Sequence, residues 1–288
     1  MIDASATGCA MHLLTFDVEH WYEGLRHRGL SGWEGYPPRD PIIINRLLAL
    51  LSEEKQLATW FMTGVFAQEF PGVARAIVEA GHEIASHGFD HVTLPRLGTR
   101  FRFREDLSRS IGVIENITGQ QIQGFRAPKW SITEEVRSWA HDEIFRAGLI
   151  YDSSLFPRLF ACNALLWPHR ITTESGGLLW EIPASIFSIG MVKLPAAGGL
   201  FLRSLPAVVT RMALAQAASN DRPGMVYLHP YDLDPKCPNP GGSILFRASR
   251  SIGVHRTWPI LQGLVSQYRF TTIREWLRWQ AGERTAAC

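Results

Sequence analysis

Short apolar segments alternate with longer amphipathic ones along nearly the whole 288-residue chain, and no shift in composition divides it. The short segments have the length of buried strands, and the longer ones carry apolar residues at helical spacing. This alternation predicts one α/β domain with a mostly parallel sheet. About seven or eight strands favour a closed or nearly closed (β/α) barrel, with a doubly wound open sheet as the alternative. The predicted strands cover residues 12–18, 58–62, 83–86, 121–125, 149–152, 178–183, 225–228 and 270–273.

Residues 80–91, AGHEIASHGFDH, read as a helix end, a short strand and two histidines four positions apart. Gly81 fits the position just after a helix, where the left-handed conformation favours glycine. His87 and His91, placed on one helical turn, would point the same way and share one metal ion. A pair of ordinary surface histidines is the alternative interpretation.

Polar residues also follow other predicted strands, and the carboxyl ends of parallel strands meet at one face. They are Asp17 and Glu19 after the first strand, then Arg126, Asp152 and His229. Two histidines and a carboxylate with open positions are typical of a hydrolytic metal site, with zinc as the default metal. A second carboxylate would serve as general base, and a further histidine would protonate a leaving amine.

Each of these residues also has a structural interpretation. Asp17 or Glu19 would cap a turn, Arg126 would form an ion pair, and Asp152 would be a helix N-cap. His229, between Leu228 and Pro230, would be a core histidine. Taken singly, Asp152 and His229 favour the structural interpretation. Taken together, polar residues at successive strand ends favour a functional site.

Composition excludes several classes of protein. Lys+Arg 29 against Asp+Glu 27 gives a net charge of +2, which does not indicate a nucleic-acid or anionic-membrane partner. The four cysteines lie far apart, which argues against a disulfide framework or a structural zinc site and for a reducing compartment. The N-terminal segment has neither a basic start nor a long apolar stretch, and no segment has transmembrane length. We therefore expect a cytoplasmic protein without a signal peptide.

The predicted domain organisation is an extension (residues 1–11), one domain (12–282) and a C-terminal tail (283–288). Two long loops are predicted at 156–177 and 235–257, and the second is a candidate to cover a site.

Five stretches carry a family resemblance: TFDVEHW, SHGFDH, GFRAPKW, YDSS and VYLHPYDLD. In order and spacing they resemble the motifs of the NodB-homology polysaccharide deacetylases, carbohydrate esterase family four, over nearly the whole chain. GGLFLRSLP and the long C-terminal segment from FRASRS to REWL are most similar to the subgroup associated with exosortase/PEP-CTERM exopolysaccharide clusters.

The resemblance implies a distorted (β/α) barrel of about seven strands, a divalent metal, usually zinc, and hydrolysis of N-acetyl groups on amino sugars. Its partner would be an N-acetylated oligo- or polysaccharide, used as polymer or precursor, and no oligomeric state is predicted. Asp17 would be the general base, held by Arg126, and His229 the general acid, tuned by Asp152. The remaining expected roles are metal binding by Glu19, His87 and His91, and substrate contact by Pro128, Trp130, Tyr151 and Leu155.

Two departures from the family pattern matter. Val18 replaces the second of two adjacent aspartates in the commonest first motif, which makes Glu19 the candidate metal ligand, as in members with an acid-x-acid motif. The fourth motif lacks its usual tryptophan, so Leu155 or Phe156 would line the acetyl pocket. Two other functions compete with deacetylation. They are an allantoinase-like amidohydrolase for a small amide or ureide, and a non-catalytic carbohydrate-binding barrel.

Overall fold

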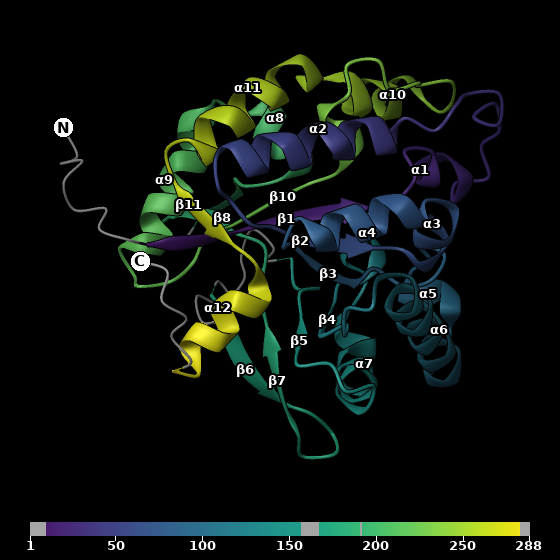
Figure 1. The fold of residues 1–288 in the computed structure, drawn as a ribbon, viewed down its shortest axis with the longest axis vertical. Helices are drawn as coiled ribbons and strands as arrows, with labels where there is room; N and C mark the ends of the chain where they lie inside the picture. The colour runs from purple at the N-terminus through teal and green to yellow at the C-terminus, as the bar shows by residue number, and fades with distance from the viewer. Residues whose placement is uncertain (1–9, 157–166, 191, 283–288) are drawn as a thin grey trace.

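A curled sheet of nine strands forms the centre of the computed structural model, which describes residues 10–156, 167–190 and 192–282 (Figure 1). Its strand order is β10-β1-β2-β3-β4-β5-β7-β6, and β11 also pairs with β1. The strands of this sheet are β1 (Met11–Val18), β2 (Thr59–Met62), β3 (Glu83–Ser86), β4 (Gly124–Phe125), β5 (Tyr151–Asp152), β6 (His169–Thr172), β7 (Leu178–Glu181), β10 (Met225–Leu228) and β11 (Arg269–Thr271).

The long strand β1 organises this sheet. Its first residues pair with β11, its middle with β10 and its last four with β2, all in parallel. The pairings from β2 through β5 to β7 are also parallel, and only β6 runs antiparallel to its neighbour. Among the described strands, the first and last of this order, β10 and β6, do not pair with each other. The sheet is therefore a curled half-barrel. The expected distorted barrel is confirmed, with nine strands instead of about seven.

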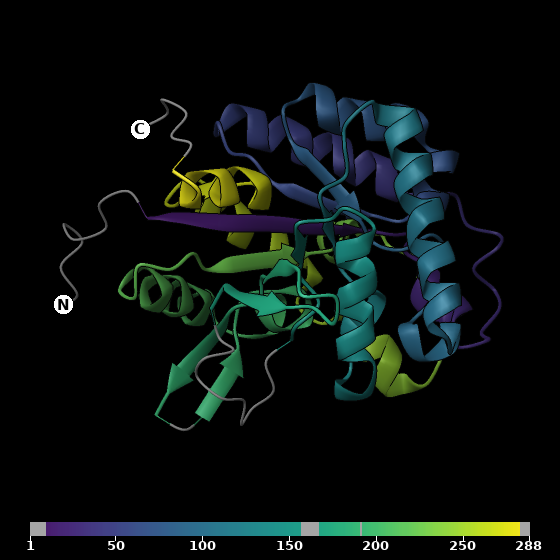
Figure 2. The same ribbon diagram turned by 90° about the horizontal axis from the view of Figure 1, so that it is seen from below.

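Helices pack along the outside of the curl. In Figures 1 and 2, α2 and α11 lie on the side of β1 and β10, whereas α4, α6 and α7 follow the β2–β5 side. The helices are α1 (Glu23–Arg26), α2 (Asp40–Glu53), α3 (Gly64–Glu69), α4 (Pro71–Glu79), α5 (Leu94–Leu97), α6 (Arg100–Thr118), α7 (Glu134–Arg146), α8 (Gly199–Ser204), α9 (Ala207–Ala218), α10 (Ile244–Ser251), α11 (Val254–Val265) and α12 (Ile273–Gln280), with 3₁₀ turns η2 (Pro128–Trp130) and η4 (Pro230–Leu233).

The two predicted long loops contain regular structure. Strand β6 lies within the first, of which residues 157–166 lie outside the described part of the chain. Helix α10 lies within the second, where the Ser243 side chain accepts a hydrogen bond from the Phe246 amide at 3.2 Å and so caps the helix start. A separate hairpin of β8 (Ile186–Ile189) and β9 (Val192–Pro195) was also not predicted. These elements are short and mostly half-exposed, so they lack the long apolar pattern on which the prediction rested.

Local turn chemistry is confirmed at the end of α4. Gly81 follows α4 with φ of 83°, as its sequence position predicts. Asp40 is the first residue of α2, and its carboxylate accepts the Trp21 amide at 3.1 Å. The extension and tail remain predictions, since residues 1–9 and 283–288 lie outside the described ranges and β1 begins at Met11. Across the described residues, no helix combines the length and apolar character that crossing a membrane requires.

Candidate active site

A cavity of about 300 Å³ opens at the carboxyl ends of β1, β3 and β10. Its lining includes most of the residues that the sequence singled out, together with parts of α8 and α10. The predicted site residues on this wall are Asp17, Glu19, His87, His91, Trp130 and His229. The second predicted loop does cover the site, because Phe246, Ser249 and Arg250 line the same cavity.

Glu19, His87 and His91 form one buried group, with one ligand atom from each lying within 4.8 Å of the others. The Nδ1 atom of His87 lies 2.8 Å from the Arg126 carbonyl oxygen, which leaves Nε2 for a metal. The Nε2 atom of His91 contacts Glu19 directly. The segment between the histidines is not a helical turn, because Gly88 and His91 have φ values of 77° and 53°. The convergence therefore comes from a tight loop.

The electrostatics of this group suit cation binding. Burial alone would raise the pKa of Glu19, but His91, His229 and His87 lower it well below its usual range. Burial lowers the pKa of His87 to about 4. A carboxylate and neutral imidazoles are the forms that bind divalent metals. One carboxylate and two imidazoles converge within 4.8 Å, and this donor set fits a metal such as zinc.

Arg126 lies fully buried beneath the cavity and fixes Asp17. Its guanidinium donates to Asp17 Oδ1 at 2.6 Å and to the Thr15 hydroxyl at 3.0 Å, and it also bonds the Ser153 backbone and hydroxyl at 3.1 and 2.9 Å. The ring of Trp130 covers it, with its centroid 4.5 Å from the Arg126 Cζ atom. A carboxylate held by charge-assisted hydrogen bonds from a buried guanidinium keeps a fixed orientation.

His229 faces both carboxylates of the first strand. Its Nε2 atom lies 3.9 Å from Asp17 Oδ2 and 3.9 Å from Glu19 Oε1. Its Nδ1 atom pairs with Asp232 Oδ2 at 2.9 Å. Burial would lower the pKa of His229, but Asp232 and the two other carboxylates raise it to about 9. The imidazole is therefore a proton donor near neutral pH.

Three functional residues escaped the sequence interpretation. Asp232 orients His229, and Arg203 holds Asp232 through its Nε atom at 3.1 Å. The Tyr231 hydroxyl donates to Glu19 Oε1 at 3.1 Å, and its ring stacks on His229 with centroids 4.6 Å apart. The spacing of three residues between His229 and Asp232 was the available signal, since a 3₁₀ turn brings i and i+3 together.

The expectation that Asp152 tunes His229 is wrong, because Asp232 occupies that place. Asp152 is fully buried at the end of β5, where one of its oxygens accepts the Ser154 hydroxyl at 2.5 Å. Its other oxygen lies 3.3 Å from His141 Nε2. The sequence interpretation chose Asp152, an acid at the end of another strand, whereas the partner of His229 lies three residues after it.

Only one of the four predicted substrate contacts, Trp130, lines the cavity. Lys129 and Trp130 both adopt left-handed backbone angles, with φ of 54° and 55°, and this turn places the indole over Arg126. Tyr151 is instead in the core, where its hydroxyl donates to Glu83 at 2.9 Å. Pro128 is buried and Leu155 half-buried, and neither is among the described lining residues.

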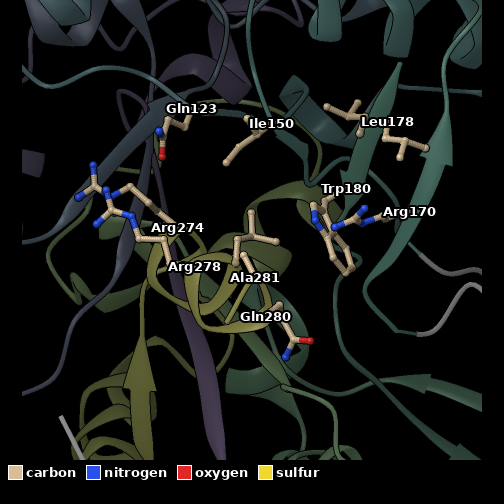
Figure 3. A pocket seen from close by; sticks show the side chains of 11 residues that line it. Gln123, Ile150, Arg170, Leu178, Trp180, Arg274, Arg278, Gln280 and Ala281 are labelled. Carbon is tan, nitrogen blue, oxygen red and sulfur yellow. The ribbon is translucent and has the colours of Figure 1, made fainter. Parts of the chain in front are cut away.

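A second cavity of about 390 Å³ lies at the other edge of the sheet, beside α12 (Figure 3). Gln123 and Ile150, which precede β4 and β5, place it at the amino ends of the parallel strands. The side chains of Arg170, Arg274 and Arg278 line it with Trp180. No predicted site residue is among the described lining residues of this second cavity.

The sequence profile of the polysaccharide deacetylase family matches residues 6–147, and that of a domain of unknown function, DUF3473, matches residues 155–278. The chain is 34% identical over 114 residues to a peptidoglycan deacetylase-like protein of Gibberella zeae, covering 39% of this chain and 32% of that protein. It is 33% identical over 112 residues to a peptidoglycan deacetylase of Helicobacter pylori, and the match covers 39% of this chain and 36% of that protein. The matched segment thus spans about a third of these relatives.

A chitooligosaccharide deacetylase of Azorhizobium caulinodans is 35% identical over 95 residues, which cover 32% of this chain and 44% of that protein. A solved structure from Mycobacterium smegmatis, assigned as a polysaccharide deacetylase, shares the fold with a TM-score of 0.59 at 19% identity, covering 98% of this chain and 94% of its own. Over residues 6–147 the chain is similar to the polysaccharide deacetylase family. The exosortase-associated subgroup stays a prediction.

Proposed function

We propose that this chain is a metal-dependent deacetylase that hydrolyses N-acetyl groups on the amino sugars of a polysaccharide or its precursor. One observation carries the proposal. Asp17, held by Arg126, and His229, held by Asp232, face each other at 3.9 Å beside the buried group of Glu19, His87 and His91. Binding alone requires neither a fixed base nor a fixed acid.

The chain's own residues supply both proton transfers. Asp17 accepts the proton of the attacking water, because Arg126 holds its Oδ1 atom and leaves Oδ2 facing the cavity. His229 donates a proton to the departing amine nitrogen, and Asp232 stabilises the imidazolium that serves as donor. A zinc ion bound by Glu19, His87 and His91 would polarise the amide carbonyl and acidify the water.

The walls of the cavity suit a sugar. The indole of Trp130 and the ring of Tyr227 lie 5.1 Å apart between centroids and provide an apolar wall, and Arg28 and Lys129 add polar groups. Sugar rings combine an apolar face with a hydroxyl rim, which such a mixed wall complements. The chitooligosaccharide and peptidoglycan deacetylases among the relatives support an N-acetylated glycan as substrate. The subgroup resemblance favours an exopolysaccharide.

The test measures acetate release from chitooligosaccharides and zinc content on one zinc-loaded sample. We expect His87→Ala to lose the zinc held by Glu19, His87 and His91, and at least about a hundredfold in rate. His255→Ala, which changes an exposed histidine on α11, is the matched control and should keep both. Full activity in a His87→Ala protein that has lost this zinc would overturn the proposal. Hydrolysis of a small ureide, without acetate release from any N-acetylated glycan, would assign the site to the allantoinase-like alternative.

A further inference from the structure

A second group of metal-ligating side chains lies outside the cavity, between α7 and the sheet. His141 comes from α7, Asp152 from the end of β5 and Glu181 from the end of β7. One ligand atom from each lies within 4.8 Å of the others. All three are buried, with exposed fractions of 7%, 0% and 3%. The group shares no residue with Glu19, His87 and His91.

We propose that His141, Asp152 and Glu181 bind a second divalent cation, of the zinc class, that holds α7 to strands β5 and β7. The proposed site is structural and is independent of the deacetylase proposal. Imidazole with two carboxylates is a donor set that zinc accepts.

The separations within the group are those of ligands that share an ion. The His141 Nε2 atom lies 3.3 Å from Asp152 Oδ2 and 3.5 Å from Glu181 Oε2. Two atoms at about 2.0–2.1 Å from a tetrahedral ion are about 3.3–3.4 Å apart. Despite this proximity, His141 Nε2 and Asp152 Oδ2 are both buried without a hydrogen-bond partner. The atoms therefore converge on one point without satisfying one another.

The remaining carboxylate oxygens are fixed by the protein. Asp152 Oδ1 accepts the Ser154 hydroxyl at 2.5 Å, and Glu181 Oε1 accepts the Leu155 amide at 2.9 Å. Each carboxylate thus uses one oxygen for orientation and turns the other toward His141, as outer hydrogen bonds orient ligands in metal sites. The Ser154 hydroxyl lies 2.8 Å from the Ala127 amide, which connects this group to the segment that carries Arg126.

Charge supports the same assignment. Two carboxylates and a neutral imidazole carry a charge of −2, which one divalent cation neutralises. Burying this charge without a counter-ion is costly, and a bound divalent cation removes that cost.

The experiment counts zinc per chain by elemental analysis after equilibration with zinc and removal of the excess. We expect about two equivalents in the wild-type chain, one in the double variant His87→Ala/His91→Asn, and none when Glu181→Gln is added to it. The double variant leaves His141, Asp152 and Glu181 unchanged. Asparagine tolerates the left-handed backbone that His91 adopts. It also removes His91 from the neighbouring group of Glu23, His27 and His91.

Glu174→Gln, which changes an exposed acid between β6 and β7, is the matched control and should not alter the count. Cobalt substitution gives a second readout, because Glu181→Gln should change the visible spectrum of the double variant. The proposal is overturned if the double variant binds no zinc, or if its remaining equivalent and cobalt spectrum persist after Glu181→Gln. Failure of acetate release has no bearing on these counts, so the two proposals fail separately.

Discussion

At the residue scale, buried polar groups in this chain are used as fixed acceptors as well as reactive groups. His12 and His82 lie outside the site, with exposed fractions of 1% and 2%. The Nδ1 atom of His12 accepts the Gly224 amide at 3.0 Å, and that of His82 accepts the Ala58 amide at 3.3 Å. A protonated Nδ1 could not accept either bond, so both rings are held neutral.

This use of histidine predicts a loss of stability in acid. Burial lowers the pKa of His12 and of His82 to about 4, whereas an unfolded histidine titrates near 6.5. Between these values the unfolded chain binds protons that the folded chain excludes. The stabilisation is therefore complete above about pH 6.5 and is lost as the pH falls toward 4. Over this pH range each histidine should contribute roughly 3 kcal/mol to the loss in the free energy of unfolding.

The measurement is the free energy of unfolding in urea from pH 7 to pH 4. The double variant His12→Asn/His82→Asn keeps an acceptor oxygen near the Nδ1 position and should lose clearly less stability over this range than the wild-type chain. His255→Asn, at an exposed position, should follow the wild-type curve. Parallel curves for the double variant and the wild-type chain would show that these two rings do not carry the effect.

The residues of the site differ in how well the sequence predicts them. Asp17, Glu19, His87, His91, Arg126 and His229 were predicted because each follows a strand or lies in a motif. Asp232 and Tyr231 lay in the quoted VYLHPYDLD motif, but their contacts with His229 and Glu19 arise from a 3₁₀ turn and from packing across the cavity. Tyr151 and Asp152 were misassigned because sequence position does not reveal toward which side of the sheet a side chain turns.

At the element scale, the arrangement of α10 depends on one side chain from α8. Arg203 donates to the carbonyl oxygens of Ser249 and Ile252 at 2.8 and 2.6 Å, at the end of α10. The same guanidinium donates to Asp232 at 3.1 Å. Helix ends have unpaired carbonyls, so a buried arginine there supplies donors that the helix lacks. Arg203 is therefore a positioning residue that couples α10 to the Asp232–His229 pair.

We expect Arg203→Gln to lower kcat for acetate release by about 10- to 100-fold, because losing charge-assisted bonds costs roughly 1.5–3 kcal/mol. Zinc bound at Glu19, His87 and His91 should remain stoichiometric, since Arg203 contacts none of these ligands in the described hydrogen bonds. Arg247→Gln, on the exposed face of α10, is the control and should leave kcat unchanged. An unchanged kcat in Arg203→Gln would show that Arg203 does not couple α10 to the Asp232–His229 pair.

Helices and strands were predictable from sequence where burial requires apolar residues at regular spacing. Strands β10 and β3 were placed at their observed bounds. The first is a buried apolar run, and the second is a buried segment that follows the helix-ending Gly81. Helix α10 was missed because none of its residues is buried, so no apolar stripe marks it. Strand β6 alternates between half-buried and exposed residues and ends the sheet, where tertiary pairing decides its conformation.

At the scale of the whole molecule, the two family profiles meet in one sheet and in one site. The first supplies Asp17, Glu19 and Arg126, and the second supplies His229 and Asp232. Strand β1 belongs to the first half, yet it pairs with β10 and β11 from the second. Burial of Leu13 and Phe16 depends on both halves, because these residues pair with β10. The boundary between the profiles is therefore not a boundary between folding units.

A chain that ends at residue 155 tests this arrangement, since it keeps the first profile but lacks β10 and β11. We expect such a fragment to unfold without a cooperative transition, because it exposes the segments of β1 that pair with β10 and β11 and leaves only the pairing with β2. The full chain should show one transition in which far-UV and near-UV circular dichroism coincide. A fragment with a sharp, coincident transition would show that residues 10–155 fold alone, and the second half would then serve only to complete the site.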